Sequence, residues 1–285
     1  MVIIQNKSGQ LANRLFAFSH FIGNVLEHKY TLINPTFGEY CKYFEATRNN
    51  DFGGHPIYVS FGVQLPFLMF DLCARFAAKC IQKSCWHEYI ALDSMNREFN
   101  LNSHNFVSLA KRKIVLTNGW QFRDYENHAK HSKIIRYFFT PKEELIKSID
   151  QLIADCRNQC DILIGVHLRR GDYKQWQNGK YYFSDTVYLD KMAQLMAYFR
   201  KMGKRVTFLL CSDEGINRQQ FQDYSIFLGP GHVIEDLYTL SKCDYIIGPP
   251  STYSMWASFY GTVPLLHIKE QGQRILLEEF RVVEG

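Results

Sequence analysis

Residues 162–173 read Ile-Leu-Ile-Gly-Val-His-Leu-Arg-Arg-Gly-Asp-Tyr. The run Ile162 to Val166 is apolar and rich in β-branched residues, which is typical of a strand buried in a parallel sheet. Ligands of open α/β sheets bind just beyond the carboxyl ends of the strands, and here Arg169 and Arg170 follow the strand. Guanidinium groups pair well with phosphate oxygens. The stretch therefore predicts an anion site at a strand end; the alternative is a surface loop with ordinary ion pairs.

Strands and helices alternate on both sides of this stretch. Near the start, a strand at 2–5, a helix from about 12 to 28 and a strand at 30–33 form a β-α-β unit. A helix is expected at 141–156. The second half predicts strands at 162–166, 206–210, 245–247 and 263–267, with helices at 186–202, 214–222, 235–242 and 253–260. The pattern predicts an α/β fold of two Rossmann-like domains facing a cleft, 1–157 and 158–285.

The composition describes a globular protein of two ordinary domains. Of the 285 residues, 46% are hydrophobic and 21% are charged, so a disordered chain is excluded. A net charge of +5 suits an anionic small molecule or an acidic membrane surface, and it is too small to indicate a nucleic-acid partner. The eight cysteines form no Cys-x-x-Cys pair, and Met1 leads directly into a strand without a signal peptide. We therefore expect a reducing cytoplasm.

One segment, residues 66–81, resembles a membrane element. It is too short and too charged to span a bilayer. Asp71, Arg75 and Lys79 share one face of a helix and the remainder is apolar, so the segment predicts an amphipathic helix. We expect it to pack on the protein's own core; the alternative is peripheral contact with a membrane, next to a lipid-linked acceptor.

Two further strand ends carry polar groups. Asp213 follows the strand at 206–210, where it can accept hydrogen bonds from a base or ribose or, alternatively, cap a helix. Residues 248–254, Gly-Pro-Pro-Ser-Thr-Tyr-Ser, join a strand to a helix, where backbone amides and the helix dipole favour an anion. Ser251 and Thr252 add hydroxyl donors there, with simple capping as the alternative. Together the three strand ends predict a nucleotide-diphosphate site.

The usual phosphate and metal motifs are absent from the sequence. It contains no Gly-x-x-x-x-Gly-Lys loop, no Gly-x-Gly-x-x-Gly and no Asp-x-Asp triplet. Its histidines show no metal-ligand spacing. We therefore expect no metal, with the arginine pair supplying the positive charge at the diphosphate.

The ordered motifs resemble the bacterial α-1,2-fucosyltransferase family and, more distantly, the α-1,6- and protein O-fucosyltransferases. Residues 167–173, His-Leu-Arg-Arg-Gly-Asp-Tyr, match the family's His-x-Arg-Arg-Gly-Asp-Tyr. Weaker matches follow the family order at 9–16, 119–125, 212–214, 235–244 and 251–256. Gln10, Ala12 and Arg14 differ from the family's Arg, Gly and Gln, and the turn with Pro249, Pro250 and Met255 is also unusual.

The resemblance implies an inverting, metal-independent glycosyltransferase of the GT-B type, which uses GDP-β-L-fucose and no cofactor. The acceptor would be a galactose-terminated glycan, bound by the N-terminal domain and fucosylated at its 2-hydroxyl. The motif positions imply these roles: Arg169 binds the β-phosphate and stabilises the departing GDP, Arg170 supports the loop or the diphosphate, His167 and Asp213 recognise guanine, Ser251 and Thr252 hold phosphate, and Asn13 lines the fucose side of the cleft.

Inversion requires the acceptor hydroxyl to attack from the face opposite GDP, ideally with a general base. Asp172 is the candidate base, and a displacement driven by the phosphate without a base is the alternative. Two other functions stay open: transfer of another GDP-sugar or formation of another fucose linkage, and a non-catalytic module that binds a glycan or nucleotide.

Overall fold

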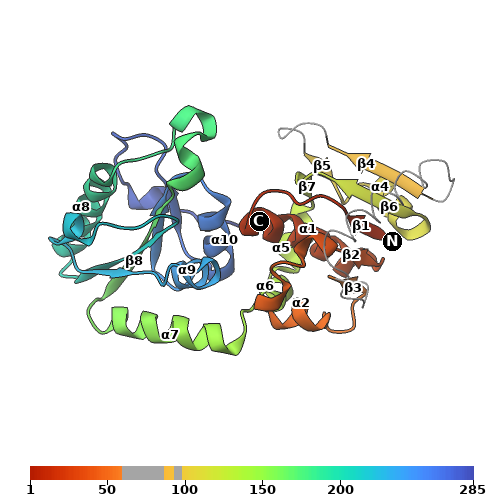
Figure 1. Cartoon of the computed structure of the whole chain (residues 1–285), viewed down its shortest axis with the longest axis horizontal. Helices are drawn as coiled ribbons and strands as arrows, with labels where there is room; N and C mark the ends of the chain where they lie inside the picture. Colours follow the sequence, from red (N-terminus) through yellow and green to blue (C-terminus); the bar gives the residue numbers. More distant parts are fainter. Residues whose placement is uncertain (60–86, 93–97) are drawn as a thin grey trace. The chain divides into compact units, whose positions relative to one another are not determined.

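The computed structural model describes residues 1–59, 87–92 and 98–285. The predicted amphipathic helix at 66–81 lies outside these residues. Two compact units make up the chain, 1–142 together with Gly285, and 143–284 (Figure 1). No helix among the described residues combines the length and the apolar character that crossing a membrane requires.

The N-terminal unit is built on a five-stranded parallel sheet in the order β3-β2-β1-β6-β4. The chain leaves the central strand β1 and turns at Gly9, where a φ of +62° requires the freedom of glycine, into helix α1. Helix α1 is buried along most of its length because it also packs against α5, α6 and β7. The strands are β1 (Val2–Ile4), β2 (Leu32–Ile33), β3 (Ile57–Tyr58), β4 (His87–Ala91) and β6 (Ile114–Asn118).

Smaller elements complete this unit. The strands β5 (Phe99–Asn100) and β7 (Phe122–Arg123) form a short parallel ribbon. Residues 35–59 form tight turns, one short helix and the edge strand β3. The helices are α1 (Leu11–His28), α2 (Glu45–Asn49), α4 (His104–Arg112), α5 (Tyr125–Lys130) and α6 (Ser132–Phe138), and the 3₁₀ turns are η1 (Pro35–Phe37) and η2 (Cys41–Tyr43).

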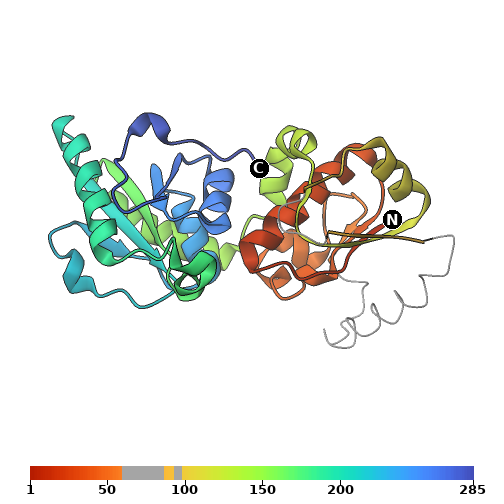
Figure 2. The same cartoon turned by 90° about the horizontal axis from the view of Figure 1, so that it is seen from above.

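The C-terminal unit contains a second five-stranded parallel sheet, in the order β10-β9-β8-β11-β12. Helix α8 covers one face, while α9 and α10 cover the other (Figure 1 and Figure 2). The strands are β8 (Ile162–Leu168), β9 (Val206–Ser212), β10 (Ile226–Leu228), β11 (Tyr245–Gly248) and β12 (Leu265–His267). The helices are α7 (Glu143–Arg157), α8 (Asp185–Lys201), α9 (Val233–Leu240) and α10 (Thr252–Gly261).

The central strand of this sheet is the predicted one. Ile164, Val166 and Leu168 face α8 within a continuous apolar core, and the strand is buried on both faces because helices cover both sides. The α/β fold class with two Rossmann-like parallel sheets is therefore confirmed. The helix predicted at 214–222 is wrong: the chain forms only a 3₁₀ turn, η5 (Arg218–Phe221), where the side chain of Asn217 caps the turn.

The division between the units lies at Lys142/Glu143, whereas the sequence predicts it at Arg157/Asn158. Helix α7 packs against α9 and so joins the C-terminal unit. Ion pairs hold α7 there, from Arg157 to Asp244 and from Lys242 to Asp150. The sequence shows the polar break after the helix, but these contacts across the fold decide to which unit the helix belongs.

The described cysteines are all free thiols. Cys156, Cys160, Cys211 and Cys243 are buried in the C-terminal unit, and burial raises the pKa of each thiol. Raised pKa values keep these groups protonated and unreactive. The predicted cytoplasmic location, which rests on reduced thiols, stays a prediction.

Candidate functional site

Three strand ends meet at one edge of the second sheet. Strand β8 lies between β9 and β11, and all three are parallel, with Leu168 paired to Ser212 and Val166 paired to Ile247. The carboxyl ends of these strands are therefore neighbours. The predicted residues of the C-terminal unit, scattered over more than eighty positions of sequence from 167 to 252, are brought together here.

Arg169 occupies the centre of this edge. Its Nη2 atom lies 2.8 Å from Oδ1 of Asp172, and its Nη1 atom lies 3.1 Å from Oδ2 of Asp213. The guanidinium carbon stands 5.6 Å from the ring centroid of Tyr173. The Arg169 side chain is only 15% exposed, whereas that of Asp172 is 54% exposed. An arginine held in this way is ready for an anion, and the exposed Asp172 is the partner that such an anion could displace.

Arg170 turns the other way. Its guanidinium forms an ion pair with Asp185 at the start of α8, and both side chains are largely buried. Its backbone N–H donates a 2.8 Å hydrogen bond to Oδ1 of Asp213. A Cβ atom at Gly171 would stand 2.8 Å from Oδ2 of Asp213, so any larger residue there would push against this carboxylate. Arg170 and Asp213 thus fix the loop that carries Arg169.

The turn before α10 supplies the second side of the site. Oγ of Ser251 accepts a hydrogen bond from the backbone N–H of Tyr253 and caps the helix, which Thr252 begins. The Tyr173 hydroxyl donates to the carbonyl oxygen of Pro250, so the arginine loop and this turn are joined. The amino end of a ten-residue helix favours negative charge through its dipole and its open N–H groups.

His167 lies beneath the two loops. It is 3% exposed, and its ring stacks on that of Tyr253 with centroids 5.0 Å apart. Burial, followed by the charge of Arg169 and the proximity of His267, lowers the pKa of His167 to about 3, so the imidazole is neutral. Its Nδ1 atom is buried and has no hydrogen-bond partner. A buried ring nitrogen of this kind is a candidate for bonding to a ligand.

Asp236 is a further carboxylate near this site to which the sequence analysis assigned no role. It lies on α9 and is 5% exposed, and its Oδ1 accepts a 3.0 Å hydrogen bond from the backbone N–H of Gly231. Burial raises the pKa of Asp236 to about 6, with Glu235 adding a smaller effect. The sequence signal was present in the motif at 235–237, but an acid in the first turn of a helix is ordinarily explained by the helix dipole.

Asn13 belongs to the N-terminal unit, in the first turn of α1. A Cβ atom at Gly9 would stand 2.1 Å from Nδ2 of Asn13, so the turn before the helix packs closely on this side chain. Asn13 thus lies in the N-terminal unit, whereas the other predicted site residues lie in the C-terminal unit.

Within the described part of the chain, no group of three or more His, Cys, Asp or Glu side chains is placed to hold a metal ion. The positive groups at the strand ends are guanidinium groups and a helix terminus. These suit phosphate, and the carboxylates beside them hold the guanidinium groups in position.

A family model described as glycosyl transferase family 11 matches residues 65–269. The chain belongs to this family. The match confirms the resemblance that the motifs predict and covers the arginine loop, Asp213 and the turn at Ser251. No curated protein matches the sequence significantly.

Solved structures share the fold at low sequence identity. Arabidopsis thaliana FUT1, as a mutant in complex with GDP, aligns with a TM-score of 0.62 and 14% identity over 98% of this chain and 72% of its own. POFUT1 in complex with GDP aligns with a TM-score of 0.55 and 12% identity, over 93% of this chain and 97% of its own. The third structure is the α-1,6-fucosyltransferase NodZ from Bradyrhizobium, soaked with GDP-fucose. It aligns with a TM-score of 0.54 and 17% identity, over 93% of this chain and 94% of its own. At these identities the likeness shows the fold alone.

Proposed function

We propose that the protein transfers L-fucose from GDP-β-L-fucose to the 2-hydroxyl of a terminal galactose on a glycan, with inversion at the anomeric carbon. The observation that carries this proposal is Arg169, fixed at the end of the central strand between two carboxylates and next to the capped start of α10. The family match supports a glycosyltransferase, and the GDP and GDP-fucose named with the structural neighbours support the donor.

The donor diphosphate lies between Arg169 and the start of α10 in this proposal. Ser251 and Thr252 hold phosphate oxygens there, together with the backbone N–H groups of the helix. As the bond between the fucose anomeric carbon and the phosphate oxygen breaks, its electron pair leaves with GDP. Arg169 meets the charge that develops on the β-phosphate, which is the electrostatic role with the largest expected effect on rate.

The nucleoside end of GDP extends toward His167. Its neutral ring can bond to the nucleotide through the unpartnered Nδ1 atom. Asp213 was predicted to recognise guanine, and its carboxylate already accepts from Arg169 and from the Arg170 backbone. We propose that Asp213 contributes to donor binding by holding Arg169 in place, and that Asn13 contacts the fucose.

The acceptor hydroxyl attacks the anomeric carbon from the face opposite GDP, forming the new carbon–oxygen bond and losing its proton. Asp172 is the proposed proton acceptor, because its side chain is exposed at the site and within the same loop as Arg169. Displacement with the proton passing to the departing phosphate is the second possibility. No metal is required in either route, since Arg169 supplies the positive charge at the diphosphate.

Calorimetric titration with GDP tests the donor assignment. We expect binding with and without EDTA; absence of binding would contradict the GDP-sugar assignment, and binding that EDTA abolishes would contradict the metal-free mechanism. Transfer from GDP-fucose to lactose and to N-acetyllactosamine, followed by product analysis by NMR, tests the linkage. An α-1,2 product supports the full proposal, whereas an α-1,6 product would move this chain to the linkage named for NodZ.

A further inference from the structure

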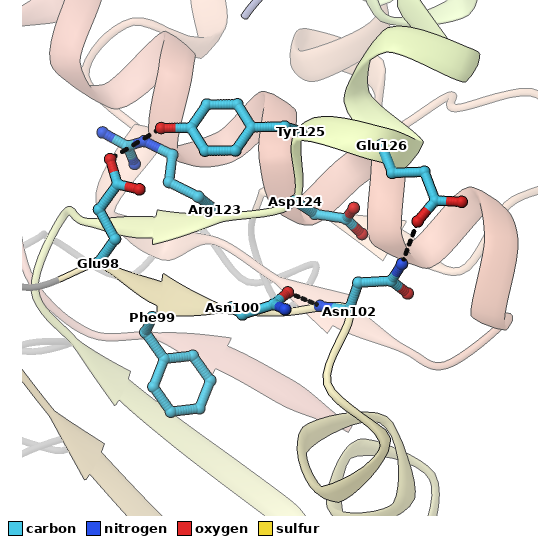
Figure 3. A pocket seen from close by; sticks show the side chains of 8 residues that line it. All are labelled: Glu98, Phe99, Asn100, Asn102, Arg123, Asp124, Tyr125 and Glu126. Atoms are coloured by element: carbon cyan, nitrogen blue, oxygen red, sulfur yellow. Dashed lines mark hydrogen bonds between the residues drawn. The ribbon is translucent and has the colours of Figure 1, made fainter.

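A separate pocket lies in the N-terminal unit, between the β5–β7 ribbon and the start of α5. Its volume is about 330 Å³. Eight residues line it: Glu98, Phe99, Asn100, Asn102, Arg123, Asp124, Tyr125 and Glu126. Side chains gather at its two ends, with Tyr125, Glu98 and Arg123 at one and Glu126 with Asn102 at the other (Figure 3). The volume is at the lower end of the range for ligand clefts, about 300–1,000 Å³, which suits a single sugar residue.

Two of the lining residues, Asp124 and Arg123, are held by several hydrogen bonds of their own. Asp124 is 2% exposed, caps α5 by accepting from the backbone N–H of Asn127, and also accepts from the side-chain amides of Asn24 and Asn127. Nη1 of Arg123 donates to the carbonyl oxygens of Trp120 and Phe122, and its guanidinium lies 4.9 Å from the ring centroid of Trp120. Lining side chains that their own hydrogen bonds already hold in place lose less conformational entropy when a ligand binds.

The rim is polar and partly open. The Tyr125 hydroxyl donates a 2.8 Å bond to Oε1 of Glu98, and the Tyr125 side chain is 50% exposed. At the other end, the Asn102 amide donates a 2.9 Å bond to Oε2 of Glu126. In each pair the bond engages one oxygen of the carboxylate, Oε1 of Glu98 and Oε2 of Glu126 (Figure 3). Carboxylate oxygens accept hydrogen bonds from the hydroxyl groups of a sugar.

The charge of the pocket decides between ligand classes. Three carboxylates, at Glu98, Asp124 and Glu126, stand against the single guanidinium of Arg123. Like charges brought together are destabilising, so this balance disfavours the phosphates of a nucleotide sugar. Carboxylates, amides and one tyrosine ring favour instead a neutral molecule with many hydroxyl groups and an apolar ring face.

We propose that this pocket binds a neutral hexose residue of the acceptor glycan, with Tyr125 against the ring face and Glu98, Asn102 and Glu126 bonded to its hydroxyl groups. The assignment deepens the proposed function, on which it rests, by naming acceptor-binding residues in the N-terminal unit. It also separates the two substrates by charge, because the site at Arg169 suits phosphate and this pocket disfavours it.

Steady-state kinetics of Tyr125→Ala and Glu126→Ala test the proposal. We expect the KM for lactose to rise about tenfold, equivalent to about 1.4 kcal/mol of binding, with the KM for GDP-fucose unchanged. Tyr137→Ala is the matched control, since Tyr137 is 73% exposed on α6 of the same unit and does not line the pocket. An unchanged lactose KM in both pocket variants, with transfer intact, would overturn the pocket assignment alone.

Saturation-transfer NMR with lactose separates this proposal from the function on which it rests. We expect lactose to receive saturation from the wild-type protein and from Tyr137→Ala, and much less from Tyr125→Ala or Glu98→Gln. Glu98 is exposed, and glutamine has nearly the same shape as glutamate, so this substitution changes the charge and leaves the fold intact. Lactose bound in this manner by a protein that transfers no fucose would support the pocket and refute the proposed reaction. Absence of a lactose signal in the wild type would refute the pocket.

Discussion

Each unit carries a nearly buried arginine in the segment of chain that follows the central strand of its sheet, and the two are held in different ways. Arg14, 9% exposed, donates to the carbonyl oxygens of Gly9 and Thr36 and also pairs with Glu39. Arg169, 15% exposed, contacts the carboxylates of Asp172 and Asp213. Arg14 keeps its backbone carbonyl partners even when the exposed Glu39 moves away, whereas the ion pairs of Arg169 go to carboxylates, of which the exposed Asp172 can give way to a phosphate. Backbone partners, more than burial, therefore distinguish a structural arginine from one available to a substrate.

The largest expected effect comes from removing the exchangeable arginine. Arg169→Ala should lower the rate of fucose transfer by about 10²–10³-fold, because the charge that develops on the departing phosphate loses its partner. Initial rates with GDP-fucose, and circular dichroism for the fold, measure this. Arg205→Ala is the control, since Arg205 forms an exposed ion pair with Asp161 and such pairs contribute about 0–1 kcal/mol. Near wild-type transfer by Arg169→Ala would remove Arg169 from the mechanism.

Asp172→Asn tests whether Asp172, the exposed partner of Arg169, accepts the proton of the acceptor hydroxyl. If Asp172 accepts the proton of the acceptor, as we propose, kcat should fall about 10²-fold while GDP affinity is kept, because an amide cannot act as the base. Rates at saturating acceptor and calorimetry with GDP give the two quantities. A kcat within a few-fold of wild type would favour displacement without a base and would leave Asp172 only as a partner of Arg169.

Arg14→Ala tests whether Arg14 stabilises the fold and takes no part in binding the donor. The carbonyl oxygens of Gly9 and Thr36 would lose their donors, so the free energy of unfolding should fall by about 1–3 kcal/mol. Urea unfolding followed by circular dichroism measures the change, with GDP affinity expected to stay at the wild-type value. If Arg14→Ala kept the wild-type free energy of unfolding and no longer bound GDP, the structural role of Arg14 would be contradicted.

His167→Asn is expected to have the smallest effect of the four substitutions, and it should change how the thermal midpoint depends on pH. The pKa of His167 is about 3 in the folded protein because of burial, against an ordinary 6.5. Between pH 6.5 and 3 the His167 ring is therefore protonated in the unfolded chain and neutral in the folded protein. Its full contribution to the free energy of unfolding is present above pH 6.5 and is lost as the pH falls toward 3. The variant should show a flatter decline of the thermal midpoint between pH 6.5 and 4, and about tenfold weaker GDP binding. An unchanged pH profile would contradict the assignment.

The sequence predicts the features that are local in the chain. The apolar run before Arg169 indicates a buried strand, Gly9 indicates a turn, and the leucine and phenylalanine spacing of residues 11–28 indicates α1; the structure contains all three. Strand β10 is not predicted from the sequence, although β1 and β12, which also have three residues each, are. Strand β4 pairs with a single neighbour at the sheet edge, and its partly polar residues hide it.

The partners of the site residues are not local, and the sequence does not predict them. Arg170 pairs with Asp185, and its backbone bonds to Asp213, which lies on another strand end. The prediction that Ser251 lies at a helix start is confirmed, but its link to Tyr173 through the neighbouring Pro250 depends on the order β8–β11 in the sheet. The pKa of Asp236 is raised mainly because the tertiary fold buries its carboxyl group.

The hydrogen bond from the Tyr173 hydroxyl to the carbonyl oxygen of Pro250 makes two distant segments one cooperative unit. Neither the loop of 169–174 nor the turn of 248–251 can open without breaking that bond, so their backbone amides should exchange with solvent at a common rate.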